Sequence, residues 1–354
     1  MSRTTLISGR SGRIERTKFL DLFAGIGGFY LGMEQAGHTC VGWVEWDKFA
    51  RQSYQAIHNV KGVWNASDIR TVRASELPRA DCWYFGFPCQ DISVAGKQKG
   101  FTAGKRSSLF FTVTGLIRDL EEEDRSSYLL IENVKNLLSI NRGIDFLKLQ
   151  IELDEIGYDV EWSVLDSAEV VPQHRERIFI VGHLRGRRTR KVFPIVRKSG
   201  ETDKPDKEVN QIGNVSKSKS FGGNPQVGRV YGTDGISPTL STMQGGGREP
   251  KIISNPHGYN KGGTRTISPT VTAGSFKDNN FVQTNILAGL RIRKLTPLEY
   301  WRLQGFPDWA FNRARQAGLS DSQLYKQAGN SVTVPVIKAI AENMAFETFG
   351  ECLK

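Results

Sequence analysis

Short apolar runs alternate with helical patterns over the first half of the chain, and this alternation limits the fold more than any other feature. Residues 18–23 form the first run, which passes through a glycine-rich turn into the helical pattern of residues 29–35. Further buried strands are predicted at residues 40–44, 81–87, 128–131 and 178–181, and further helices at residues 109–120 and 146–153. Strands and helices that take turns predict an α/β fold, with a Rossmann-like, mainly parallel sheet covered by helices on both faces.

From about residue 185 the amino-acid composition changes, and the chain becomes rich in Gly, Ser, Lys, Asn and Pro. Within this stretch, residues 235–241 (Gly-Ile-Ser-Pro-Thr-Leu-Ser) are echoed 31 residues later by residues 266–272. This predicts a smaller, irregular β-rich domain. Helical texture returns at residues 295–304, and a last helix is predicted from Pro335 to about residue 346. We divide the chain into a flexible leader (1–16), a main domain (17–189 with 291–354) and a second domain (190–290).

The net charge of +11 is unevenly spread, because residues 183–290 hold 17 basic and 7 acidic residues. Such an excess is the footprint of a surface that binds a polyanion, although a solvated surface is equally common for a single charge run. The 4 cysteines form no CxxC pair and no His/Cys cluster, so we expect no metal and a reduced, cytoplasmic setting. No run of about 18 apolar residues occurs, so no membrane association is predicted.

The glycine turn after the first predicted strand has the features of a nucleotide site. Gly25 and Gly28 let the backbone approach a ligand at the start of a helix, and Glu45 ends the second strand at a distance typical of a carboxylate that meets ribose hydroxyls. Tyr30 replaces the third glycine of the dinucleotide pattern, which favours a smaller adenosine ligand. The turn could equally be structural only. Trp46 is either a platform for adenine or an ordinary core aromatic.

Four reactive side chains follow or precede predicted strands. Cys89 and Glu132 each come just after a buried strand, and Arg175 and Arg177 stand two apart before another. A thiol, a carboxyl group and two guanidinium groups could attack, protonate and neutralise a polar heterocycle. Taken singly, a buried cysteine is more often inert and each charged residue more often part of a surface ion pair.

The motifs in this chain resemble, in order, those of the cytosine-5 DNA methyltransferase family of bacteria and phages. The resemblance covers nearly the whole chain outside residues 1–16 and 190–290. It rests on FLDLFAGIGGF (19–29), EWD (45–47), SDI (67–69), GFPCQ (86–90), ENV (132–134), QHRER (173–177), LTP (295–297), RLQGFP (302–307) and GNSV (329–332). Val171, His174 and Leu298 depart from the family's usual residues, and none of them is a predicted catalytic residue.

The resemblance implies a DNA (cytosine-5-)-methyltransferase with S-adenosylmethionine as methyl donor. Cys89 would attack carbon 6 of cytosine, Glu132 would engage ring nitrogen 3, and Arg177, with Arg175 nearby, would hold the carbonyl oxygen of the base. The target base would be flipped out of the duplex. The implied cofactor-binding residues are Phe23, Gly25, Ile26, Gly28, Glu45, Trp46, Asp68, Ile69, Pro88, Leu109, Asn330, Ser331 and Val332. Because the last three lie near the end of the chain, the final helix should pack back on the main domain.

The resemblance makes residues 190–290 the target-recognition domain and double-stranded DNA the partner. It implies DNA contacts by Gln90, Ser93 and Arg106, and the side chains of Gln244 and Arg248 could read base edges. The repeated Ile-Ser-Pro-Thr segments could instead be only the β scaffold of this domain. We expect a monomer in a restriction-modification or phage-type DNA methylation system. Whether a restriction endonuclease for the same site accompanies it stays open.

Three other readings of the sequence remain. The tRNA-modifying branch of the same family shares the catalytic residues but has a reduced recognition region, so the long basic stretch favours DNA. An inactive copy that serves as a binding module is disfavoured by the intact Cys89 and Glu132. An unrelated thiol hydrolase would need a histidine placed to serve Cys89, and it would leave the adenosine-type site unexplained.

Overall fold

The computed structural model describes most of the chain outside its termini and several loops. The described residues are 17–87, 108–195, 208–216, 218, 220–242, 249–254, 263–265, 280–282 and 291–344. The predicted leader (1–16) lies outside them. No helix in these ranges is long and apolar enough to cross a membrane. The same ranges contain no group of three or more His, Cys, Asp or Glu residues that could hold a metal ion.

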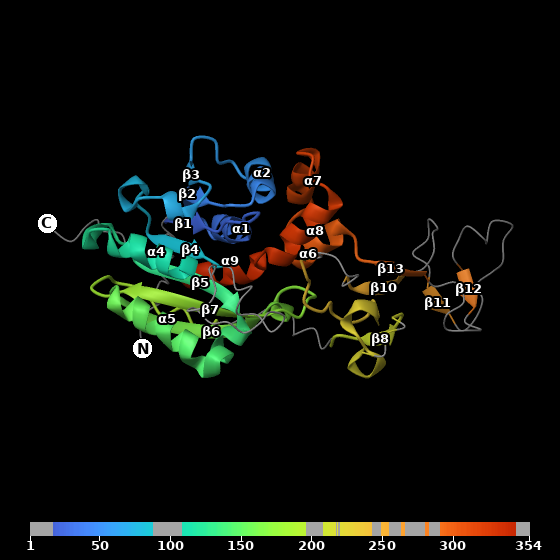
Figure 1. Ribbon diagram of the computed structural model, residues 1–354. Coiled ribbons are helices and arrows are strands. Elements are labelled where there is room, and N and C mark those ends of the chain that lie inside the picture. The colour runs from blue at the N-terminus through green and yellow to red at the C-terminus, as the bar shows by residue number, and fades with distance from the viewer. Residues whose placement is uncertain are drawn as a thin grey trace, which may run out of the picture.

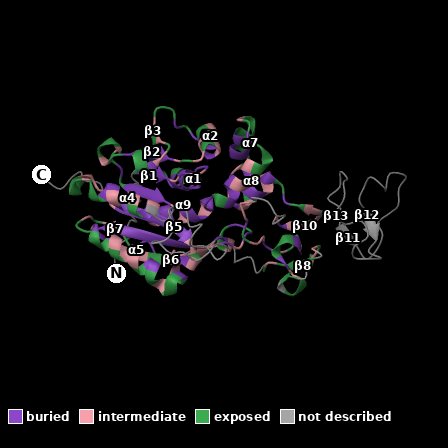
Figure 2. Cartoon of the chain, in the orientation of Figure 1, coloured by how far each residue is buried: buried purple, intermediate pink, exposed green. Residues whose placement is uncertain are grey.

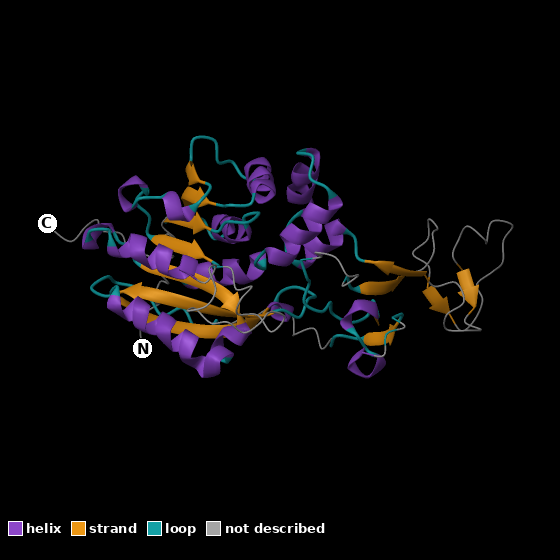
Figure 3. Ribbon diagram, viewed as in Figure 1, coloured by secondary structure: helices purple, strands orange, loops and turns teal. Residues whose placement is uncertain are grey.

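A seven-stranded sheet forms the centre of the molecule (Figures 1 and 3). Its strands are β1 (Lys18–Leu22), β2 (Thr39–Val44), β3 (Trp64–Ala66), β4 (Cys82–Phe85), β5 (Tyr128–Val134), β6 (Tyr158–Asp166) and β7 (Glu176–Leu184). Their order across the sheet is β3-β2-β1-β4-β5-β7-β6. All neighbours from β3 to β5 pair in parallel, whereas β7 runs antiparallel to both β5 and β6. The predicted mainly parallel α/β sheet is confirmed, and β6 is a strand that the sequence analysis missed.

Helices cover both faces of this sheet, as predicted. The helices on the sheet are α1 (Gly28–Gln35), α2 (Lys48–Ile57), α4 (Ser108–Arg118), α5 (Ile144–Glu155) and α9 (Val334–Asn343), whereas α6 (Pro297–Leu303), α7 (Asp308–Gln316) and α8 (Asp321–Asn330) form a group with its own core beside the sheet. Short 3₁₀ turns lie at η1 (Ile69–Thr71), η2 (Ala74–Glu76), η3 (Glu122–Asp124), η4 (Lys135–Leu138), η5 (Ile140–Gly143), η6 (Ser167–Glu169), η7 (Ser220–Gly223) and η8 (Gln226–Gly228).

Alternation along each central strand creates two separate cores. In β5, Leu129 and Ile131 face a core shared with α4 and α5, whereas Tyr128 and Leu130 face a core shared with α1 and α9. This follows from the period of two in a strand, because successive side chains point to opposite faces. The buried residues concentrate in the sheet and on the inner sides of these helices (Figure 2). A third core lies among α6, α7 and α8.

A smaller β region extends from the helices α6–α8 (Figure 1). Strands β8 (Gln211–Asn214), β9 (Arg229–Tyr231), β10 (Lys251–Ser254) and β13 (Arg291–Lys294) form a sheet in the order β13-β10-β9-β8, and β11 (Gly263–Arg265) pairs with β12 (Asn280–Val282). The small sheet mixes parallel and antiparallel pairs, as expected for an irregular β lobe. The first repeat copy, residues 235–241, is described, and the second lies outside the described residues.

The last described helix, α9, packs against α1, as the sequence analysis expected of the final helix. A side chain on Gly32 would lie 2.6 Å from Ile337 Cβ, so the two helices are in close contact there. Ile337 and Ile340 of α9 are fully buried beside Met33 of α1. Helix α9 is thus part of the main core.

We expect Gly32→Ala to destabilise the protein. The added methyl group would overlap Ile337, and overpacking of this kind costs about 1–3 kcal/mol. Urea unfolding would measure the change. The matched control is Gly115→Ala in α4, where an added Cβ has no neighbour within 4 Å and the free energy of unfolding should stay equal or rise by up to about 1 kcal/mol. Equal stability of Gly32→Ala and the native protein would show that the contact between the two helices can relax without cost.

Candidate active site

The direction of β7 brings the end of β5 and the start of β7 to the same edge of the sheet. Because β7 runs antiparallel to β5, its first residues lie where β4 and β5 end. Val134 is opposite Arg177 in this pairing, and Glu132 is opposite Phe179. Motifs that are more than 40 residues apart in the sequence therefore meet at this edge.

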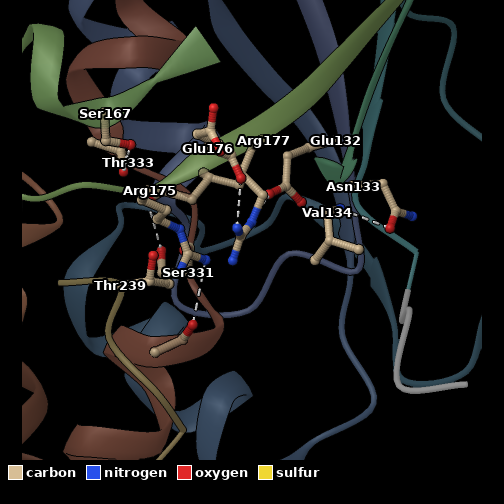
Figure 4. A network of polar contacts seen from close by, with 12 residues as sticks. Glu132, Asn133, Val134, Ser167, Arg175, Glu176, Arg177, Thr239, Ser331 and Thr333 are labelled. Atoms are coloured by element: carbon tan, nitrogen blue, oxygen red, sulfur yellow. Dashed lines mark hydrogen bonds and ion pairs between the residues drawn. The ribbon is translucent and has the colours of Figure 1, made fainter. Parts of the chain in front are cut away.

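Glu132 and Arg177 form an ion pair at this edge. Arg177 Nε lies 3.1 Å from Glu132 Oε1, and the two side chains are only 17% and 14% exposed. Arg177 Nη1 also donates to the Glu176 carbonyl oxygen at 2.8 Å (Figure 4). A guanidinium group and a carboxyl group are thus held together in a place with little water, where charge interactions are stronger than at the surface.

The segment that leads to Cys89 lies against Glu132. A side chain on Gly86 would come within 3.1 Å of Glu132 Oε2, and Asn133 Nδ2 donates to the Phe87 carbonyl oxygen at 3.5 Å. A Cβ at position 86 would therefore make a tight contact with the carboxyl group, which would have to move by a few tenths of an ångström. Pro88, Cys89, Gln90, Ser93 and Arg106 lie outside the described residues, as do Gln244 and Arg248.

The two arginines of the QHRER motif have different neighbours. Arg175 is 4% exposed, and its Nη2 donates to the carbonyl oxygens of Ser331 at 2.9 Å and Gly329 at 3.4 Å (Figure 4). Its backbone N–H donates to Asp166 Oδ1 at 2.8 Å. The structure therefore brings Arg177 to Glu132 and brings Arg175 to the GNSV motif near the end of the chain.

The first Ile-Ser-Pro-Thr segment joins this motif through main-chain bonds. His174 N donates to the Ser237 carbonyl oxygen and Ser237 N to the Pro172 carbonyl oxygen, both at 2.8 Å, and Thr239 Oγ1 donates to the His174 carbonyl oxygen at 2.7 Å. With its amide oriented to satisfy both neighbours, the fully buried Gln173 accepts from Leu240 N at 3.1 Å and donates to the Leu303 carbonyl oxygen at 3.1 Å. The sequence analysis did not predict this contact between the two segments.

A second set of predicted residues surrounds the turn between β1 and α1. Phe23, Gly25 and Gly27 all have positive φ angles, of 57°, 58° and 84°. Such a conformation costs little in glycine but is strained in Phe23, and strained residues of this kind cluster at functional sites. Ile26 is buried in the core formed with α6–α8.

The GNSV motif lies against the start of α1. A side chain on Gly28 would lie 2.7 Å from both Ser331 Oγ and Val332 Cγ2. Asn330 ends α8 directly before this contact. The structure therefore brings Gly28 and the predicted residues near the end of the chain together.

The Glu45 carboxylate closes the turn from the other side. Its two oxygens accept hydrogen bonds from Gly25 N and Asp47 N, each at 2.7 Å. Burial raises the pKa of this carboxyl group, and the two amide hydrogen bonds oppose that rise. Asp47 also caps α2 and pairs with Lys326 of α8, so the loop is fixed to the C-terminal helices.

Trp46, Asp68 and Ile69 complete this side of the site. Trp46 is 68% exposed, so it is not a core aromatic. Asp68 caps the turn η1, while Ile69 is buried in the core that Leu109 of α4 also contacts. The predicted cofactor residues among the described part of the chain thus lie around the ends of β1, β2 and β3.

Comparisons with known proteins agree with this arrangement. A family model described as C-5 cytosine-specific DNA methylase matches residues 17–345. The type II methyltransferase M.NlaX of Neisseria lactamica is 35% identical, over 92% of this chain and 96% of that protein. The orphan methyltransferase M.SPBetaI of Bacillus phage SPbeta is 29% identical, over 94% of this chain and 98% of that protein. Among solved structures, the Dnmt2 methyltransferase of S. pombe has a TM-score of 0.61 at 20% identity, and the match covers 92% and 97% of the two chains.

The family model spans most of the chain, and the sheet order and motif positions fit one class of protein, the methyltransferases. The chain belongs to the C-5 cytosine-specific DNA methylase family. It is a DNA cytosine methyltransferase.

We expect Gly86→Ala to slow methyl transfer. The added Cβ would press on the Glu132 carboxyl group and move it relative to Arg177, and small displacements of reacting groups lower rates by about tenfold or more. Single-turnover rates at saturating DNA and methyl donor would measure this. Gly115→Ala again serves as the control. A native rate for Gly86→Ala would mean that the position of the Glu132 carboxyl group does not limit the chemical step.

Proposed function

We propose that this enzyme methylates carbon 5 of a cytosine in a specific duplex DNA sequence, with Cys89 as covalent nucleophile. The observation that carries the proposal is the partly buried Glu132–Arg177 pair at the edge of the sheet. The Gly86-Phe87 segment, which leads directly to Cys89, packs against that pair. Membership of the cytosine-5 family supports the reaction type.

In this proposal the chain's own groups activate a ring that is otherwise a poor methyl acceptor. The Cys89 thiolate forms a bond to carbon 6, while Glu132 gives a proton to ring nitrogen 3 and Arg177 holds the carbonyl oxygen of the base. The electron pair that reaches carbon 5 takes up the methyl group. Loss of the carbon-5 proton to water and return of the nitrogen-3 proton to Glu132 then restore the ring double bond and expel Cys89 as a thiolate. When bound, S-adenosylmethionine supplies the electrophilic methyl group and leaves as a neutral thioether.

We assign the two arginines different parts in this chemistry. Arg177 contacts the Glu132 carboxyl group, so its guanidinium lies where a bound base would meet both residues. Arg175 is a positioning residue, because its buried guanidinium donates to the carbonyl oxygens of Gly329 and Ser331. In this role it holds the GNSV motif beside the sheet.

The residues around the β1–α1 turn fit S-adenosylmethionine. The buried Glu45 carboxylate suits the ribose hydroxyls, and the exposed ring of Trp46 suits adenine. Gly28 packs directly against Ser331 at the start of α1. We propose the cofactor contacts of Phe23, Gly25, Ile26, Gly28, Glu45, Trp46, Asp68, Ile69, Pro88, Leu109, Asn330, Ser331 and Val332.

Residues 190–290 form the target-recognition domain in this proposal. The concentration of basic residues at 183–290 supports contact with phosphates, and a cytosine inside a duplex must be flipped out before Cys89 can reach it. Gln244 and Arg248 remain proposed base-reading residues, and Gln90, Ser93 and Arg106 proposed DNA contacts. The long basic region favours DNA over tRNA.

The named relatives suggest the biological setting. M.NlaX is a type II methyltransferase, whereas M.SPBetaI is an orphan methyltransferase of a phage. We propose that the present enzyme is a cytoplasmic, monomeric modification enzyme of one of these kinds, with or without an endonuclease for the same site.

We expect Cys89→Ala to abolish methyl transfer while cofactor binding stays nearly unchanged. The native enzyme should form a stable adduct with duplex DNA that contains 5-fluorocytosine, because a carbon-5 fluorine cannot leave as a proton does. Labelled S-adenosylmethionine with duplex DNA or tRNA measures transfer, and denaturing gels measure the adduct. The control is Cys352→Ala, which removes a thiol that lies outside every motif. Turnover by Cys89→Ala, absence of the adduct, or a preference for tRNA would each refute part of the proposal.

We also expect residues 190–290 to carry the choice of DNA sequence. This stretch would be grafted into a relative with a different known target, and bisulfite sequencing would map the methylated cytosines. The chimera should methylate the site of the present enzyme. An active chimera that keeps the original site of its host would place recognition elsewhere in the chain.

A further inference from the structure

Arg70 contacts two of the proposed adenosine-binding residues at once. Its guanidinium carbon lies 4.8 Å from the centre of the Trp46 ring. Its Nε donates to Asp68 Oδ1 at 2.9 Å and its Nη2 to Asp68 Oδ2 at 2.7 Å. One side chain therefore links an indole ring and a carboxylate that come from different loops.

This link fixes the two groups relative to each other. The forked pair holds the plane of the Asp68 carboxylate, and the cation above the indole ring holds the plane of Trp46. Trp46 is 68% exposed, so core packing does little to fix its rotamer. Each carboxylate oxygen has more than one lone pair, so Asp68 can accept from Arg70 and from a further donor.

We infer that Arg70 is a positioning residue for the adenine ring of the cofactor. The inference rests on the proposed function, in which the Trp46 ring suits adenine and Asp68 is a cofactor contact. Arg70 orders both partners before the cofactor binds, which lowers the entropy lost on binding. Lysine could not replace it, because an ammonium group lacks the planar fork that pairs with a carboxylate and stacks on an aromatic ring.

A competing role for Arg70 predicts the opposite effect on cofactor affinity. A guanidinium that stacks on an indole ring and donates to a carboxylate makes the same kinds of contact as adenine. If Arg70 competed with adenine for these groups, its removal would strengthen cofactor binding. The two roles therefore predict opposite changes in affinity.

Titration calorimetry with S-adenosylmethionine and S-adenosylhomocysteine would separate them. We expect Arg70→Ala to weaken both ligands about three- to tenfold, the scale of an exposed cation–π contact and the ordering that it provides. Arg70→Lys should resemble Arg70→Ala. The control is Arg73→Ala, which removes a more exposed pair, in which Arg73 Nε and Nη2 both donate to Glu76 Oε1, and which should leave affinity unchanged.

Two further measurements exclude a merely structural effect. In steady-state kinetics, Arg70→Ala should raise KM for S-adenosylmethionine and leave kcat unchanged. In a Trp46→Ala background, Arg70→Ala should weaken binding by a clearly smaller factor, because the partner is already gone. Unchanged or tighter binding by Arg70→Ala, or equal factors in both backgrounds, would overturn the inference.

Glu45→Gln distinguishes failure of the inference from failure of the proposed site. Its carboxylate accepts a hydrogen bond from Gly25 N in the proposed ribose position and takes no part in the Arg70–Asp68 pair. If Glu45→Gln weakens binding and Arg70→Ala does not, only the role of Arg70 is wrong. If neither variant changes affinity, the proposed cofactor site itself is misassigned.

Discussion

The antiparallel course of β7 is the constraint on which the candidate active site depends. Side chains at the end of a strand can meet those at the start of its neighbour only when the two strands run in opposite directions. This is why Arg177 reaches Glu132 across the β5–β7 pair. A parallel β7 would carry Arg177 to the opposite edge, about seven residues or more than 20 Å away along the strand. The other contacts of the QHRER motif follow from its position at this edge.

Arg175 connects the arginine motif to residues that we propose to bind the cofactor. A buried guanidinium is costly unless its donors are paired, and here the carbonyl oxygens of Ser331 and Gly329 accept from it. The same Ser331 lies against Gly28 at the start of α1. Ser331 therefore contacts both the arginine motif and the glycine turn. Because the packing between them is tight, a shift in either one would displace the other.

The sequence predicted the parts of this structure that local chemistry determines. The central strands appear as apolar runs because they are buried on both faces. Edge strand β6 escaped because, after Tyr158, its side chains are half-buried or exposed and give no apolar run. Helices α7 and α8 escaped because small residues such as Ala314 and Ala328 make their buried contacts. Both arginines precede the same predicted strand, so nothing in the sequence could assign them different neighbours.

The contact between the recognition region and the arginine motif is of a kind that sequence patterns cannot reveal. It consists of main-chain bonds from His174 N to the Ser237 carbonyl oxygen and from Ser237 N to the Pro172 carbonyl oxygen, with Thr239 and Gln173 adding side-chain bonds. Main-chain groups are present whatever the side chains are, so this contact places little restriction on the types of residue around it. Under the proposed function, recognition regions with different base-reading residues would therefore dock on the same sheet in the same way. The hydrophobic residues Ile236 and Leu240 are buried at this contact, so the segment is fixed by packing as well as by hydrogen bonds.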